Sequence, residues 1–175
     1  MRKLKNKDLQ RITLEEFKTT KKTPITIVLD NVRSALNVGS IFRTADAFLI
    51  KEIILCGITK TPPSKEIRKS ALGATDSVDW KSQNNTLSAV SRLKRDGHHI
   101  IAIEQADKSS KLNDFTIPQK QITIIMGNEI NGVCQDVIDI CDQVIEIPQF
   151  GTKHSLNVSV SASIVIWELW KKMNP

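Results

Sequence analysis

Short apolar segments alternate with amphipathic segments along most of this chain, and this alternation restricts the fold more than any other feature. Six segments have the length and composition of buried strands, and five have the apolar spacing of helices. Such alternation favours an α/β fold with a mostly parallel sheet and helices on both faces. The expected strands are residues 25–30, 52–57, 77–80 (at an edge), 99–105, 122–127 and 144–148, and the expected helices are residues 38–49, 65–72, 87–97, 133–141 and 156–173.

The first 22 residues differ from the rest of the chain in charge. They contain eight Lys or Arg and three acidic residues, so they hold most of the net charge of +6. Thr13 and Glu16 have the spacing of a capping box, which predicts a short helix here. We therefore expect a basic arm over residues 1–24 and one domain over residues 25–175. Two interpretations stay open: the arm improves solubility, or it binds a polyanion.

The composition argues against several classes of protein. No apolar run reaches the roughly 20 residues that a membrane-spanning helix requires, and the N-terminus lacks the apolar core of a secretion signal. We expect a cytoplasmic protein without a membrane partner. The three cysteines have no paired spacing, and neither CxxC nor HxxxH occurs, so we expect no disulfide framework and no metal site.

Sheets of this type usually bind ligands at the carboxyl ends of their strands. Dinucleotides are common ligands, and their binding uses a G-x-G-x-x-G turn after the first strand. Here the first strand runs into DNVRSALNVGS, which contains one glycine, and the P-loop pattern is absent as well. A nicotinamide-dependent oxidoreductase is therefore disfavoured.

The segment LNVGSIFRTADAF combines a core-facing apolar stripe with an arginine. The helical spacing of its apolar residues predicts that one face is buried. Gly39, Arg43 and Ala47 form a second line, in which the small residues leave room for a ligand to approach the backbone. Asn37 occupies the position expected for an N-cap. The alternative is a surface ion pair between Arg43 and Asp46, with Asn37 only capping the helix.

The segment ITIIMGNEINGV leads from a buried strand into a polar turn. Glu129 follows Gly127 and Asn128 at the mouth of this strand, where a sheet of this kind would receive a polar ligand. The alternative is an ordinary turn, in which Glu129 interacts with the dipole of the next helix. The residues alone leave both interpretations open.

A third segment, residues 144–170, joins a strand to the last helix. Ser155 is placed to cap this helix, and Asn157 is expected in its first turn. The helix is apolar on most of its circumference, which a terminal helix with one face in solvent would not be. We expect the sheet to cover one side and a second copy of the chain to cover the other.

Together the three segments resemble the motifs of the SpoU (TrmH-type) branch of the SPOUT superfamily, which are S-adenosylmethionine-dependent RNA 2′-O-ribose methyltransferases. NVGSIFR is similar to the first motif, N-x-G-x-x-x-R, while IIMGNE and IPQFGTKHSLNVSVSA are similar to the second and third. The resemblance covers residues 25–173. Two positions depart from the family pattern: Ile130 stands where the second motif often has glycine, and Gln149 where the third often has methionine.

The resemblance implies a deep C-terminal trefoil knot, homodimers packed in part through the last helix, and an active site drawn from both subunits. Arg43 would lie near the 2′-oxygen and its phosphate. We expect it to stabilise the oxyanion rather than act as the base, because guanidinium resists deprotonation. The other implied catalytic residues are Asn37, Glu129, Ser155 and Asn157. The implied cofactor-binding residues are Met126, Gly127, Asn128, Ile147, Pro148, Leu156 and Glu104.

The resemblance therefore favours methyl transfer from S-adenosylmethionine to a ribose 2′-hydroxyl of a structured RNA. Transfer RNA is slightly favoured over ribosomal RNA, because the chain has a compact, single-domain build. The alternative is a catalytically idle, knotted protein that binds RNA or assists its assembly.

Overall fold

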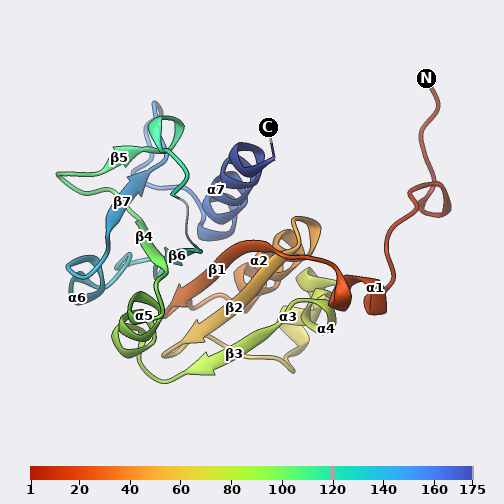
Figure 1. Cartoon of the computed structure of the whole chain (residues 1–175), viewed down its shortest axis with the longest axis horizontal. Helices are drawn as coiled ribbons and strands as arrows, with labels where there is room; N and C mark the ends of the chain where they lie inside the picture. Colours follow the sequence, from red (N-terminus) through yellow and green to blue (C-terminus); the bar gives the residue numbers. More distant parts are fainter. Residues whose placement is uncertain (119–120, 175) are drawn as a thin grey trace.

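A parallel β-sheet forms the centre of the computed structural model, which describes residues 1–118 and 121–174 (Figure 1). Within these residues the sheet has seven strands in the order β3-β2-β1-β6-β4-β7-β5, and all neighbouring pairs are parallel. The strands are β1 (Thr23–Asp30), β2 (Ile50–Cys56), β3 (Trp80–Gln83), β4 (His99–Ile103), β5 (Ser110–Lys111), β6 (Ile122–Met126) and β7 (Gln143–Glu146).

Helices connect the strands and cover the sheet. None of the described helices combines the length and the apolar character that crossing a membrane requires. The α-helices are α1 (Leu14–Thr19), α2 (Ala35–Ala47), α3 (Lys65–Ala71), α4 (Ala74–Ser77), α5 (Thr86–Arg95), α6 (Gln135–Ile138) and α7 (Val158–Met173), and two 3-10 helices, η1 and η2, span Asn6–Asp8 and Leu112–Asp114.

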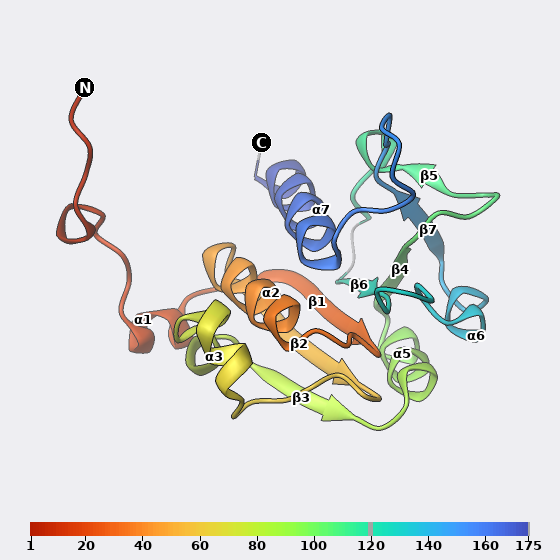
Figure 2. The ribbon, with the colours of Figure 1, turned by 180° about the vertical axis from the view of Figure 1, so that it is seen from behind.

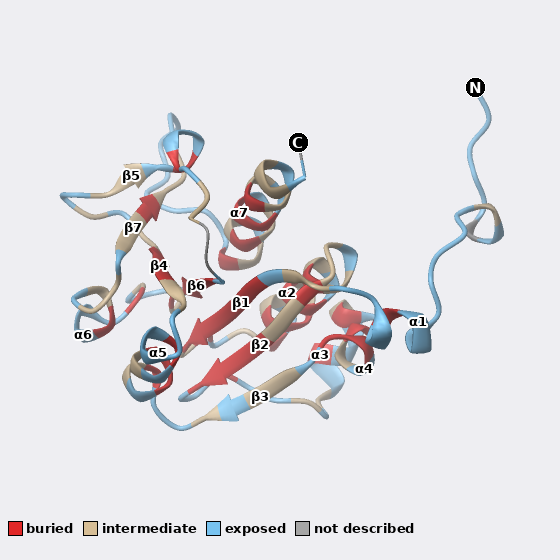
Figure 3. Cartoon of the chain, in the orientation of Figure 1, coloured by how far each residue is buried: buried red, intermediate tan, exposed pale blue. Residues whose placement is uncertain are grey.

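Alternate side chains of the central strands contribute to two separate apolar cores. Ile25, Ile27 and Leu29 of β1 belong to the core that includes residues of α2, α3, α4 and α7, whereas Val28 belongs to the core with α5 and α6. Much of β1 and β2 is therefore buried on both sides (Figure 3). The predicted α/β fold, with a parallel sheet and helices on both faces, is confirmed.

Some elements differ in extent from those expected. The helix expected over residues 133–141 is reduced to α6, because the chain turns back to the sheet at Asp142, whose N–H and carboxylate both bond to the backbone of Ile100. The strand expected over residues 77–80 begins later, as β3, because Ser77 still belongs to α4. The loop after β4 contains the short strand β5, which the sequence did not predict.

The basic arm contains the predicted short helix, α1. The Thr13 hydroxyl accepts a hydrogen bond from the Glu16 N–H, and the Glu16 carboxylate accepts one from the Thr13 N–H at 2.7 Å. Phe17 is 4% exposed and belongs to the core, and Lys18 pairs with Asp79 at 2.6 Å. Before α1 the chain extends away from the sheet (Figures 1 and 2). The arm is thus tied to the domain through α1, while the boundary at residue 24 stays a prediction.

Candidate functional site

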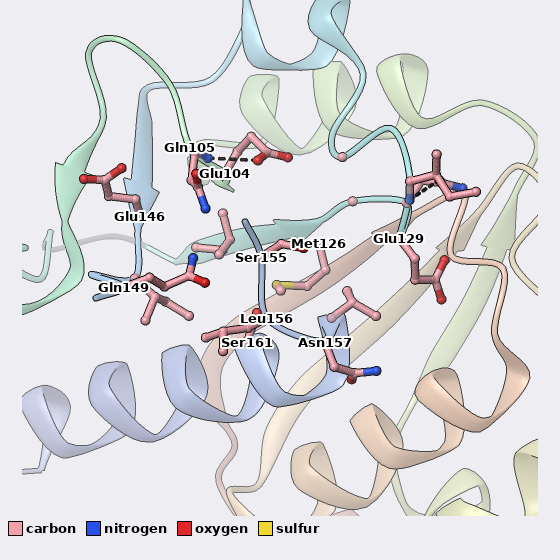
Figure 4. Close-up of a pocket in the computed structure, with 17 residues that line it drawn as sticks. Glu104, Gln105, Met126, Glu129, Glu146, Gln149, Ser155, Leu156, Asn157 and Ser161 are labelled. Atoms are coloured by element: carbon pink, nitrogen blue, oxygen red, sulfur yellow. Dashed lines mark hydrogen bonds between the residues drawn. The ribbon is translucent and has the colours of Figure 1, made fainter. Parts of the chain in front are cut away.

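The carboxyl ends of β4, β6 and β7 meet around a cavity of about 350 Å³ (Figure 4). These strands are neighbours in the sheet, and the segment before α7 closes the cavity. The volume is within the range of small-molecule sites. Nine predicted residues line the cavity: Glu104, Met126, Gly127, Asn128, Glu129, Ile147, Ser155, Leu156 and Asn157. Three predicted residues are not among those that line it: Asn37, Arg43 and Pro148.

The loop after β6 is a tight turn that only small residues permit. Asn128 and Gly132 exchange backbone hydrogen bonds of 3.0 and 2.9 Å, and a Cβ atom at Gly127 would lie closer than 3.0 Å to the backbone of Gly132. The Asn128 side chain accepts from the N–H groups of Ile130 and Asn131 and donates to the Asn31 carbonyl at 2.7 Å. The second motif therefore fixes the shape of this cavity wall.

Two neighbouring side chains at the end of β4 connect the other walls. The Glu104 carboxylate accepts from the N–H groups of Gln105, at 2.9 Å, and Val133, at 3.1 Å. The Gln105 side-chain amide donates to the carbonyl of His154 at 2.7 Å. Glu104 thus holds the loop after β6, and Gln105 holds the segment that precedes α7.

Glu129 binds the beginning of α2 rather than the helix that follows it in the sequence. Its carboxylate accepts from the N–H groups of Arg33 and Ser34, at 2.9 and 3.0 Å, and from the Asn37 side chain at 2.9 Å. Partial burial acts to raise the pKa of Glu129, but these three hydrogen bonds outweigh it and hold the pKa below its usual value. The carboxylate is therefore ionised at neutral pH.

A chain of side-chain hydrogen bonds joins all three motif segments. The Asn157 amide donates to the Asn37 carbonyl oxygen at 3.1 Å, and the Asn37 amide donates to Glu129. Both predicted helix caps were wrong by a few residues: Ser34 caps α2, so Asn37 lies in its first turn, and Asn157 rather than Ser155 caps α7. Asn37 is thereby free to link the other two segments.

Arg43 lies away from the cavity of its own chain. Its side chain is exposed, and within the described residues no carboxylate lies within ion-pair distance of it. The alternative pair with Asp46 is therefore not formed, and Asp46 accepts instead from the Ser77 hydroxyl. Arg43 lines a different groove, of about 1100 Å³, together with Arg11 of the arm.

The interpretation of Gly39 as space for a ligand was wrong. This glycine is buried, and an added Cβ would lie closer than 3.0 Å to the Ser70 hydroxyl and the Ile67 carbonyl of α3. Gly39 therefore allows α3 to pack closely against α2, one turn before Arg43.

One face of α7 carries exposed apolar side chains. Val160, Ile164 and Trp167 are 47%, 37% and 49% exposed and recur at helical spacing. Trp167 stacks on Trp170 with ring centroids 5.6 Å apart, and both contact Phe48 at the end of α2. The opposite face of α7 is buried against the sheet, so the helix has the two apolar sides that the sequence predicted.

Sequence reasoning missed several polar residues that line the cavity. Figure 4 shows Glu146 and Gln149 at one end of the cavity, opposite Glu129 and Asn157. The signal that could have identified Gln105 and Glu146 is their position at the carboxyl ends of expected strands. In the ranges that the structure describes, no group of three His, Cys, Asp or Glu side chains could hold a metal ion.

A model of the SpoU rRNA Methylase family matches residues 24–167 of this chain. The chain belongs to this family. The matched range includes all three motif segments that the Asn157–Asn37–Glu129 chain joins.

Curated relatives of this SpoU-family chain carry the names of RNA methyltransferases. The 23S rRNA (guanosine-2'-O-)-methyltransferase of Neisseria meningitidis serogroup B is 32% identical over 145 residues, which are 83% of this chain and 58% of that protein. The tRNA (guanosine(18)-2'-O)-methyltransferase of Escherichia coli K12 is 31% identical over 158 residues, which are 87% of this chain and 66% of that protein. The chain thus spans less than two thirds of these relatives' own length.

Two solved structures have the same fold, and the name of one of them includes the TrmH/SpoU family. The A. aeolicus TrmH/SpoU tRNA modifying enzyme has a TM-score of 0.81 and 25% identity, over 91% of this chain and 80% of that chain. The AdoMet-bound rRNA methyltransferase from Sinorhizobium meliloti has a TM-score of 0.81 and 28% identity, over 89% of this chain and 59% of that chain. The SpoU family assignment is therefore supported by both sequence and fold.

Proposed function

We propose that this chain transfers the methyl group of S-adenosylmethionine to a ribose 2′-hydroxyl of a structured RNA in the cytoplasm. The observation that carries the proposal is the Asn157–Asn37–Glu129 chain, which joins three sequence-distant motif segments beside a cavity. The names of the relatives include both transfer and ribosomal RNA substrates. We favour transfer RNA slightly, because the chain has a compact build.

The cavity fits S-adenosylmethionine in size and in the character of its lining. Met126, Ile147 and Leu156 supply apolar contacts, and the turn at Gly127 and Asn128 supplies backbone groups. The carboxylates of Glu104 and Glu146 also line the cavity, and their charge favours a cationic ligand. Pro148 would act indirectly, by positioning its neighbours. S-adenosylmethionine, when bound, supplies a methyl group already activated for transfer.

Calorimetry with S-adenosylmethionine tests the cavity assignment. We expect binding to the parent chain and none to Ser161→Trp, because an indole at this lining position would fill the space. Binding that survives in Ser161→Trp would place the donor elsewhere.

We assign Arg43 the stabilisation of the reacting 2′-oxygen and the binding of the adjacent phosphate. The planar guanidinium can make two parallel hydrogen bonds to an anion, which lysine cannot. Asn37, Glu129 and Asn157 would hold α2 and α7 in register around the reacting groups, and Ser155 would face the acceptor. The proton of the 2′-hydroxyl passes to solvent or to the RNA, because the guanidinium of Arg43 is a very weak base.

A second copy of the chain would bring Arg43 to the reaction. Two observations support a homodimer: Arg43 is outside the cavity of its own chain, and the apolar face of α7 is exposed in one copy. Mixing Arg43→Ala with Ser161→Trp tests this arrangement. We expect the mixture to recover part of the activity that each variant lacks, because one mixed site contains both intact parts. No recovery in a mixture shown to form mixed dimers contradicts a shared site.

We also infer that the C-terminal segment is threaded as a trefoil knot. The sheet order is compatible with this inference, because β6 and β7 add to opposite sides of β4. The segment before α7 then closes the cavity formed by the loops after β4 and β6. The fold similarity to SpoU structures is consistent with such threading.

Replacing Arg43 gives the most direct test of catalysis. We expect Arg43→Ala to fold, to bind S-adenosylmethionine normally and to lose at least ~100-fold in methyl transfer, as when a positioned transition-state group is removed. Arg43→Lys should recover little of this loss. Near-normal turnover in Arg43→Ala would show that Arg43 has no catalytic role.

The alternative function is a catalytically idle protein that binds RNA. It predicts RNA binding without donor binding, so the same calorimetry separates the two. All five polar motif positions are present in this chain, which favours the enzyme.

A further inference from the structure

The exposed face of α3 carries a row of basic side chains beside the groove that contains Arg43. Lys65, Arg68 and Lys69 are all exposed and lie on one side of the helix, because Arg68 and Lys69 follow Lys65 by three and four residues. In the described part of the chain, none of them forms an ion pair. We call this set the α3 basic face.

The α3 basic face leads directly to Arg43. Gly39 allows α3 to approach α2 one turn before Arg43, and Ala71 and Leu72, at the end of α3, line the same groove as the arginine. Leu72 is 65% exposed and continues the row by one turn beyond Arg68 and Lys69. The α3 basic face therefore borders the groove of Arg43 at Leu72.

The acidic groups near this surface do not neutralise it. Glu66 lies on the flank of α3 and accepts a hydrogen bond from the Ser64 hydroxyl at 2.9 Å, so it is engaged at the start of the helix. Asp46 and Asp76 also line the groove of Arg43, and Asp46 is bonded to Ser77. On α3 itself, Glu66 is one acid against the three cations of the α3 basic face.

We propose that the α3 basic face binds the phosphate backbone of the RNA and guides it toward Arg43. The proposal rests on the proposed function, because it takes the partner of Arg43 to be RNA. Unpaired, exposed cations in a row are suited to successive phosphates, and each neutralised phosphate releases counterions. The surface holds the strand without reading its sequence, so it extends the binding site beyond the basic arm.

Two double variants with equal charge loss test this proposal. Arg68→Ala/Lys69→Ala removes two cations from the α3 basic face. Arg92→Ala/Arg95→Ala removes two exposed cations from α5, which covers the opposite face of the sheet. Both replacements are by alanine at exposed helical positions, so both variants are expected to fold. Thermal unfolding of each double checks this.

Binding of bulk transfer RNA is then measured between about 50 and 200 mM salt, where phosphate contacts change affinity strongly. We expect the α3 double to bind about 10-fold more weakly and to lose about one to two units of salt slope, one per lost phosphate contact. The α5 double should keep the parent's slope and bind within about twofold of it.

Equal losses of RNA affinity in both double variants would show that binding responds to net charge alone, which would overturn the proposal. An unchanged RNA affinity and salt slope in Arg68→Ala/Lys69→Ala would also overturn it. Binding of S-adenosylmethionine and methyl transfer by the parent are measured separately. A chain whose RNA binding depends on α3 but which transfers no methyl group contradicts the proposed function and leaves the α3 basic face intact.

Discussion

The cavity at the ends of β4, β6 and β7 and the groove around Arg43 differ in how their polar groups are satisfied. Around the cavity, Glu104, Asn128 and Glu129 each accept hydrogen bonds from two or more protein groups. In the groove, Arg43 and Arg11 are exposed, and in the described ranges neither has an ion-pair partner. One chain thus preorganises the cavity, which we propose as the S-adenosylmethionine site. It leaves the groove around Arg43, which we propose as the RNA side, to be completed by other molecules.

The largest effect should come from breaking the link between the two regions at Glu129. Glu129→Ala leaves two backbone N–H groups and the Asn37 amide without their acceptor, so α2 loses its fixed position relative to the cavity. We expect methyl transfer to fall ~100-fold or more, comparable to the loss of a positioned catalytic group. Glu15→Ala, on the exposed side of α1, is the control and should stay near the parent rate. Retention of activity by Glu129→Ala would mean that the link is dispensable.

Truncation of the basic arm should have the next largest effect, and this effect should be confined to the binding of RNA. Deleting residues 1–12 removes five cations and keeps α1, whose Phe17 belongs to the core. We expect RNA binding to weaken ~10-fold or more and its salt dependence to flatten, because fewer counterions are released. Affinity for S-adenosylmethionine should not change. An unchanged salt slope would support the interpretation of the arm as a solubilising segment.

A smaller effect should follow when the segment before α7, which lines the proposed S-adenosylmethionine cavity, is no longer held in place. Gln105→Leu removes the N–H that bonds to the His154 carbonyl without adding a charge to the cavity, and we expect S-adenosylmethionine to bind about 5- to 10-fold more weakly, equivalent to one hydrogen bond. His154→Ala keeps the carbonyl and is the matched control.

Trypsin cleavage after Lys153 provides a second measurement that needs no ligand. Cleavage should be faster in Gln105→Leu than in His154→Ala, because the segment is no longer held. Equal cleavage with weaker donor binding would show that Gln105 contacts the donor and does not hold the segment.

The smallest effect should be a pH-dependent difference in stability between the parent and Glu129→Gln. The folded pKa of Glu129 is lowered, so its stabilising effect is present above the unfolded pKa of about 4.3 and is lost as pH falls through the folded value. We expect the melting temperatures to differ at pH 7 and to converge as the pH falls through the folded pKa of Glu129. A difference that persists unchanged at low pH would point to packing rather than charge.

The elements with strong periodicity were predictable from the sequence, and the contacts between distant segments were not. The continuous burial of β1 follows from its unbroken apolar composition, and the apolar stripe of α2 follows from local spacing. The capping of α2 was misplaced because Ser34 and Asn37 are both good caps three residues apart, and only the partner Glu129 decides between them. The role of Gly39 depends on α3, which local sequence does not place.

The site residues show the same limit. The family resemblance led to nine residues that line the cavity, eight of them in the motifs. It also placed Arg43 at the same site, but in one chain Arg43 lies in another groove. Gln105 belongs to no motif, and its contribution depends on a backbone carbonyl 49 residues away. A pattern in the sequence identifies side-chain types, whereas folding determines which backbone groups they meet.

The bonds from Asn37 span 92 residues to Glu129 and 120 residues to Asn157. During synthesis, α2 therefore leaves the ribosome long before the last of its partners has been made. A nascent or prematurely terminated chain already exposes its basic arm but lacks the Asn157–Asn37–Glu129 chain. The late arrival of the C-terminal segment thus makes its synthesis a precondition for the proposed activity.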